Sequence, residues 1–241
     1  MSYGTSGDSR LSKNEKREAA REKARVLREE QKKKDRRTKL ILQGSIILAS
    51  LAIVAIIALV VVNSIKPAGP GPRNMASDGI QLSQGAIATE TPGLKPGEDP
   101  VPNVRDEASG VLDIQMYVDY LCPICGQFEA TNGEYISSLL ENGGTTVEIH
   151  PIAILDRLSQ GTKYSTRAVN AAACVADMSP NQFYDFHNQL FANQPAENTT
   201  GLTDEEIIAL TVSAKVENAD KIASCIKHQS FKAWATAATA R

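Results

Sequence analysis

The chain has 241 residues, 42% of them hydrophobic, and a formal net charge of −2 at pH 7. This length and composition fit one folded domain with appendages, and exclude collagen-like and wholly disordered proteins. The charge is unevenly distributed, because residues 1–39 contain 14 Lys and Arg against 7 Asp and Glu while the remainder is acidic. Such asymmetry indicates two compartments or two partners.

Residues 1–39 form a basic arm that lacks glycine and proline from residue 11 onward and is rich in Ala, Glu, Lys and Arg. This composition predicts a solvated helix. Its last turns are attracted to an anionic membrane leaflet. Nucleic acid is not an expected partner, because Glu is interleaved with the basic residues and no aromatic residue follows Tyr3 in the arm.

Residues 40–65 are predicted to form a transmembrane helix. Positions 40–62 carry no charge, and at about 1.5 Å per residue they can cross the roughly 30 Å hydrocarbon core of a lipid bilayer. A buried core helix and a cleaved signal peptide are the alternatives, although the run is too long for a signal peptide and no A-x-A site follows it. Because the basic residues 32–39 precede the span, we expect a cytoplasmic N-terminus and an extracytoplasmic remainder in a single-pass cell-membrane protein.

Residues 66–104 read as an extracytoplasmic linker. Seven of the eleven prolines lie in residues 66–102, together with several glycines, which predicts an extended spacer. The middle of the segment, residues 75–89, is less typical of a linker, and Asp78-Gly79, flanked by Met75 and Ile80/Leu82, is a candidate turn of a short hairpin there.

Residues 105–241 are predicted to form the folded domain. Polar and apolar residues alternate over 111–119 as in a β-strand, and Cys122-Pro123 then stands at a helix start. Asn142-Gly143-Gly144 ends that helix, and 145–155 reads as a second strand, which implies a parallel strand–helix–strand unit. Residues 162–241 are predicted to be helical, with helices over 163–178, 181–193, 204–216 and 218–240.

The Cys122-Pro123-Ile124-Cys125 motif allows three interpretations. A zinc site needs two more ligands nearby, and Cys174 and Cys225 lie far along the chain. A purely structural disulfide across so short a loop would stabilise little. A redox pair is the third and favoured interpretation, because the unpaired N–H groups and the dipole of a helix N-terminus stabilise a thiolate.

In this interpretation Cys122 is the exposed nucleophile, and Cys125 resolves the mixed disulfide. Pro123 and Ile124 carry no charge, and by shaping the turn they tune the redox potential.

The run from Tyr120 to Phe128, with its Cys-Pro-Ile-Cys motif after a strand, resembles the DsbA-like branch of the thioredoxin superfamily. The helical register around Tyr164, Ala168, Ala172 and Cys174 supports this likeness, as do the anchor and spacer, which are similar to actinobacterial members. The resemblance covers roughly residues 105–241 and implies an α/β thioredoxin-like fold with a helical insertion at 162–241.

The resemblance further implies a protein thiol–disulfide oxidoreductase that forms or rearranges disulfides in exported proteins, without a cofactor or a metal. It implies a membrane redox partner that resets the cysteine pair, and a disulfide between Cys174 and Cys225. Two buried free thiols are the alternative to that disulfide. Membership of a larger membrane complex, as a docking subunit with a non-catalytic disulfide, is the alternative function.

One departure from the family pattern concerns the last part of the fold. The family continues past the insertion with a strand that begins at a cis-proline, a second strand and a helix, but here no proline follows Pro195. Two interpretations follow: the chain is truncated before these C-terminal strands, which we favour, or the protein has lost that half of the fold.

Other candidates carry weaker signals. His150 and His187 are proton-transfer candidates, although a lone histidine is more often structural. Glu129, one helical turn beyond Cys125, is a possible proton acceptor but reads as an exposed helix residue. The aromatic residues Tyr184, Phe186 and Phe191 are expected in the core.

Overall fold

The computed structural model describes residues 13–64, 69–104 and 110–241. The chain divides into two compact units, Met1–Lys66 and Pro67–Arg241.

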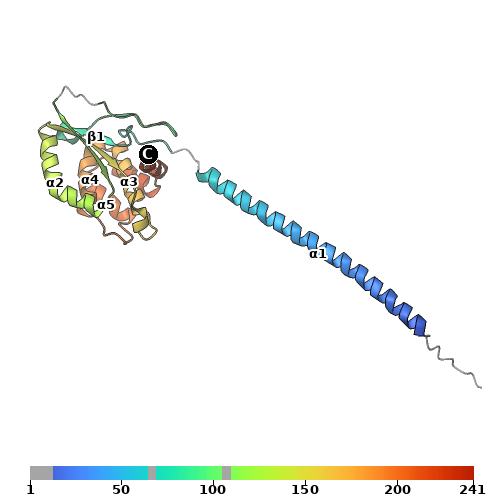
Figure 1. Cartoon of the computed structure of the whole chain (residues 1–241). Coiled ribbons are helices and arrows are strands. Elements are labelled where there is room, and N and C mark those ends of the chain that lie inside the picture. Colours follow the sequence, from blue (N-terminus) through green and yellow to red (C-terminus); the bar gives the residue numbers. More distant parts are fainter. Residues whose placement is uncertain (1–12, 65–68, 105–109) are drawn as a thin grey trace, which may run out of the picture. The chain divides into compact units, whose positions relative to one another are not determined.

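The described part of the N-terminal unit is one long helix, α1 (Lys13–Ser64), coloured blue to cyan in Figure 1. It runs through the predicted boundary at residue 39 without interruption, because residues 13–43 contain neither glycine nor proline. Within Arg21–Ile57, the helix is long and apolar enough to cross a membrane, and the apolar side chains there are exposed. Helix α1 is therefore a candidate membrane span.

The second unit contains a mixed four-stranded sheet in the order β2-β1-β4-β3. Its strands are β1 (Ile80–Ser83), β2 (Ile87–Ala88), β3 (Leu112–Val118) and β4 (Thr145–Pro151). β3 and β4 are parallel, whereas β1 is antiparallel to both β4 and β2. Among the described residues β3 lies at the edge of the sheet.

Part of the predicted linker belongs to this sheet. Met75, Ile80 and Leu82 are buried in the core, so residues 75–88 are not the extended spacer that the proline content predicts. A hairpin forms, but the chain reverses at a 3₁₀ turn, η1 (Gln84–Ala86), and not at Asp78-Gly79. Gly79 serves close packing instead, because a Cβ there would lie 2.6 Å from Nε2 of His150.

Helix α2 (Pro123–Glu141) connects β3 to β4 and forms the predicted parallel unit. It ends at Asn142-Gly143, where Gly143 has a φ of 70° that favours glycine. Its Ile136 and Leu140 are buried in the core, where Val147 and Ile149 of β4 also lie.

The remaining segment is helical. It contains η2 (Asp156–Leu158), α3 (Tyr164–Met178), η3 (Pro180–Gln182), α4 (Phe183–Ala192), α5 (Asp204–Ser213), α6 (Ala219–Lys227) and α7 (Lys232–Ala240). The single helix predicted over 218–240 is wrong, since the chain breaks between α6 and α7. Gln229 takes a φ of 49° there, and the turn lets the N–H of Phe231 donate to Oδ1 of Asn170 at 2.8 Å.

Helix α3 is the centre of this helical part, and it contacts α4, α5, α6 and α7. Twelve of its fifteen residues are buried, and five of these are alanines, whose small side chains let the neighbouring helices approach. A disulfide joins Cys174 of α3 to Cys225 of α6, with both residues buried, as the resemblance implied.

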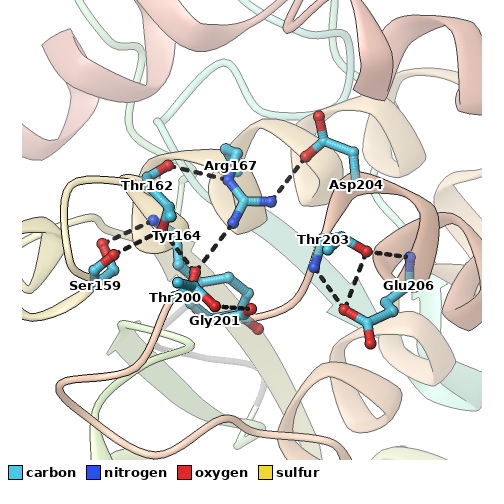
Figure 2. Close-up of polar contacts among 9 residues, drawn as sticks. All are labelled: Ser159, Thr162, Tyr164, Arg167, Thr200, Gly201, Thr203, Asp204 and Glu206. Carbon is cyan, nitrogen blue, oxygen red and sulfur yellow. Dashed lines mark hydrogen bonds and ion pairs between the residues drawn. The ribbon is translucent and has the colours of Figure 1, made fainter.

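Arg167 of α3 anchors the loop that leads into α5 (Figure 2). Its guanidinium donates to Oδ1 of Asp204 at 2.9 Å and to the carbonyl oxygens of Thr162 and Thr200 at 3.1 and 3.5 Å. The predicted helix start at Thr203 is confirmed, because Thr203 and Glu206 form a capping box. Arg167 and the capping box therefore both hold the end of the loop that enters α5.

Gly201 lies inside this loop, directly against the ring of Tyr164 (Figure 2). Its φ is 69°, and a Cβ at this position would lie 2.4 Å from the Tyr164 ring. Both the backbone conformation and the space require glycine here.

We expect Gly201→Ala to lower the free energy of unfolding by roughly 2–4 kcal/mol, because it adds steric overlap to the cost of a left-handed backbone. Gly161→Ala is the matched control. Gly161 also has a positive φ, 85°, but nothing lies within 4 Å of its Cβ position. Urea unfolding followed by the fluorescence of Trp234, the single and buried tryptophan, measures both variants. Equal losses would show that the Tyr164 contact contributes nothing.

Replacing both Cys174 and Cys225 by Ala should cost about 4 kcal/mol, since their bridge closes a loop with a sequence separation of 51. The same unfolding measurement on the Cys122→Ala/Cys125→Ala variant is the control, and we expect a much smaller change there because neither thiol is bridged. A loss below about 1 kcal/mol for the first variant would contradict the assignment of a stabilising bridge.

Candidate functional site

The four residues of the Cys-Pro-Ile-Cys motif form the turn between β3 and α2. Cys122 is the N-cap of α2, and Pro123 occupies the first helical turn, where its missing N–H costs no hydrogen bond. The N–H of Cys122 donates to the Asp119 carbonyl at 2.9 Å, and the Cys122 carbonyl accepts from Gly126 at 3.0 Å. Both cysteines are free thiols and half-buried, while Ile124 is 71% exposed. The motif is thus accessible at the start of the helix.

The environment of Cys125 disfavours its ionised form. Burial raises the pKa of its thiol to about 11, and a hydrogen bond to Cys122 and the charges of Cys122 and Asp119 act in the same direction. The backbone N–H of Asp119 offsets part of this effect. At neutral pH Cys125 is therefore protonated.

Asp119 holds the cysteine turn in place through hydrogen bonds of its side chain. The sequence analysis did not identify this residue as part of the site. Its carboxylate is buried and accepts hydrogen bonds from the N–H of Leu121 and of Leu155, both at 2.9 Å, and from the hydroxyl of Ser165 at 2.7 Å. Burial raises its pKa, and these hydrogen bonds oppose that shift. The sequence feature that could have identified Asp119 is its position, as an acidic residue at the end of a strand just before the cysteine motif.

Gln194 connects the helical insertion to the same turn. Its Nε2 donates to the carbonyl oxygens of Tyr120 and Cys122 at 3.2 and 2.9 Å. A Cβ at Gly126 would lie 2.2 Å from Oε1 of Gln194, so glycine allows this approach. The loop after α4 thereby holds the N-terminus of α2.

A buried polar chain lies behind the turn and joins three elements. The hydroxyl of Tyr120 lies 3.3 Å from Nδ1 of His187, whose Nε2 lies 3.2 Å from Oε1 of Glu129. The expectation that Glu129 is exposed is wrong: it is 8% exposed, because α4 covers this face of α2. His187 is fully buried among aromatic rings that include Phe183 and Phe191.

His150 belongs to a different part of the sheet. It is buried on β4, stacks on Tyr117 with ring centroids 4.5 Å apart, and lies 3.3 Å from Oε1 of Glu148. Burial alone would raise the pKa of Glu148, but the neighbouring His150 and hydrogen bonds from Ser77 and Gln115 lower it to about 2. His150 therefore belongs to a buried structural contact with Glu148 and Tyr117.

The zinc interpretation needed two further ligands, and Cys174 and Cys225 were the remaining cysteines of the chain. Cys174 and Cys225 are bonded to each other, so they are not available as ligands beside Cys122 and Cys125. Among the described residues there is no cluster of three or more His, Cys, Asp or Glu side chains suited to a metal.

Comparisons with known proteins agree with this geometry. The family model described as Thioredoxin matches residues 107–241. The structure of oxidised DsbA from Mycobacterium tuberculosis is 29% identical, with a TM-score of 0.52 over 67% of this chain and 76% of that one. MdbA, a thiol-disulfide oxidoreductase from Corynebacterium diphtheriae, shares the fold at 18% identity, with a TM-score of 0.52 over 74% of this chain and 79% of that one.

A curated relative is longer than this chain. The serine/threonine-protein kinase PknE of Mycobacterium tuberculosis is 34% identical over 118 residues, which are 47% of this chain but 20% of the kinase. The chain thus matches about a fifth of that protein.

The family match covers more than half of the chain and includes β3, β4, the cysteine turn and the helical insertion. This chain belongs to the thioredoxin family and has a DsbA-like thioredoxin fold.

Proposed function

We propose that this protein is a membrane-anchored, extracytoplasmic thiol–disulfide oxidoreductase that forms or rearranges disulfides in exported proteins through Cys122 and Cys125. The proposal rests on the different environments of the two thiols. Cys122 caps a helix N-terminus, whereas burial raises the pKa of Cys125 to about 11.

This difference assigns the roles. Cys122 stands at the N-cap of α2, where the first N–H groups of a helix interact favourably with negative charge, whereas the raised pKa of Cys125 keeps that thiol protonated. In the oxidised enzyme a substrate thiolate attacks the Cys122 sulfur, and Cys125 leaves and takes up a proton. A second substrate thiol then displaces Cys122, so that the substrate gains a disulfide and the enzyme retains two electrons as a dithiol.

The anchor and charge pattern support the proposed location. Helix α1 contains an apolar stretch preceded by the basic residues 32–39, which favours a cytoplasmic N-terminus. The proposed partners are therefore exported proteins with thiols, the lipid bilayer, and a membrane redox partner that reoxidises the dithiol. The alternative, a docking subunit of a larger membrane complex, requires a pair that takes no part in exchange.

The roles of the two cysteines are tested by single serine variants of the full chain in detergent. Cys122→Ser should abolish oxidation of a reduced dithiol peptide. Cys125→Ser should instead accumulate a mixed disulfide when it is given the disulfide-linked dimer of a single-cysteine peptide. The Cys122 thiolate attacks the peptide disulfide and one peptide leaves as a thiol, while no Cys125 thiol is present to release the other peptide; intact-protein mass spectrometry detects the adduct. If Cys122→Ser kept its activity, the assignment of Cys122 as the exchanging thiol would fail. If the unsubstituted, oxidised chain itself did not oxidise the peptide, the docking alternative would replace the redox proposal.

Alkylation rates test the ionisation of the thiols directly. With reduced protein and iodoacetamide, we expect Cys125 to react more slowly than Cys122 at pH 7. The Cys125 rate should rise about tenfold per pH unit until it levels off near pH 11, since only the thiolate reacts. Peptide mapping resolves the two sites. A plateau for Cys125 below about pH 9 would contradict the assignment.

A further inference from the structure

Helices α2 and α4 border an open groove of about 460 Å³. We call it the α2–α4 groove; its lining includes Glu129, Gly133, Glu134, Ser137, Glu141 and Asn188. The first of these residues lies one helical turn after Cys125, so the groove begins beside the cysteine turn.

The charge around the groove has one sign. Helix α2 carries Glu129, Glu134 and Glu141, helix α4 carries Asp185, and neither helix contains a lysine or an arginine. Within the described residues, neither Glu134 nor Glu141 forms an ion pair. A concave surface lined by one sign of charge concentrates the opposite charge.

Glu129 adds a second and independent observation. Its Oε1 is paired with His187, but its buried Oε2 has no hydrogen-bond partner among the described residues. A buried carboxylate oxygen without a hydrogen-bond donor has lost the free energy of its solvation by water. A cation that approaches the oxygen recovers part of that free energy.

A glycine without a side chain lies beside this buried oxygen. Gly133 lies one turn beyond Glu129, and a Cβ at Gly133 would be 3.6 Å from Oε2. Glycine inside a helix is unfavourable by roughly 1 kcal/mol relative to alanine. At Gly133 the floor of the groove therefore has no side chain. A cationic group placed over Gly133 attracts the Glu129 carboxylate through protein, where the dielectric constant is lower than in bulk water and the attraction is stronger.

We propose that the α2–α4 groove binds an arginine or lysine side chain of a protein partner, with Glu129 as the buried anchor and Glu134 and Glu141 at the rim. Such binding places a basic residue of the partner one helical turn from Cys125. The inference concerns recognition only and does not depend on the redox chemistry proposed above.

The test uses the full chain in nanodiscs of zwitterionic lipid, so that the membrane itself does not attract the probe. The probe is a fluorescent, cysteine-free peptide of alternating arginine and serine, and its citrulline counterpart is the uncharged control. Fluorescence anisotropy at low salt measures the dissociation constants. We expect the arginine peptide to bind at least tenfold more tightly than the citrulline peptide.

Three variants then locate the binding. Glu129→Gln should weaken the arginine peptide at least tenfold, and Gly133→Ala at least fivefold although it changes no charge. Glu217→Gln is the matched control: it removes the same charge from an exposed residue between α5 and α6, and should change binding less than twofold. Equal effects of Glu129→Gln and Glu217→Gln, or unchanged binding by Gly133→Ala, would overturn the proposal.

Two further measurements keep the test decisive. Asn188→Lys places a cation in the groove from α4 without altering α2, so it should weaken the peptide at least tenfold even if Glu129→Gln fails to fold. Unchanged binding by Asn188→Lys contradicts the site. Displacement of the peptide by Mg²⁺ alone at micromolar concentration would show an ion site, and would overturn recognition of a side chain. Because no readout involves thiol exchange, loss of redox activity in Cys122→Ser leaves each result interpretable.

Discussion

The buried carboxylate of Asp119 is the contact on which the cysteine turn depends. A carboxylate taken out of water is costly unless hydrogen bonds replace the lost solvation. Here the donors come from Leu121 in the turn, from Leu155 after β4, and from Ser165 in α3. These three elements are therefore drawn to one point at the end of β3, and the cysteine motif starts from that point.

The two thiols differ because the same turn gives them different surroundings. Cys122 stands at the N-cap of α2, next to free N–H groups, while Cys125 is one turn further in and is partly desolvated beside Asp119. The chemical asymmetry of the motif thus follows from its position at a helix start and from one buried acid. Pro123 and Ile124 complete the turn without adding charge.

The helical insertion takes part in the site and is not a separate appendage. Gln194 binds the carbonyl oxygens on either side of Leu121, and His187 joins Tyr120 to Glu129. Both residues depend on the position of α4, which packs on the buried helix α3. The small residues of α3 and the Cys174–Cys225 bridge hold this assembly, so the stability of the insertion and the geometry of the cysteine turn are coupled.

The sequence alone determined those features that depend on local pattern. Apolar length predicted the candidate span, alternation predicted β3, Pro123 predicted the start of α2, and Thr203 with Glu206 predicted the start of α5. The pairing of Cys174 with Cys225 was anticipated from the family resemblance and not from spacing.

The tertiary structure decided what depends on residues distant in the chain. Met75, Ile80 and Leu82 join the core, and β1 pairs with β4 in the sheet, within a proline-rich context that reads as linker. Glu129 is buried because α4 lies over it, and helical periodicity within α2 does not contain that information. Asp119 and Gln194 act on the cysteine turn only after folding brings Ser165, Leu155 and the loop after α4 beside it, since hydrogen-bond partners are chosen in space and not along the chain.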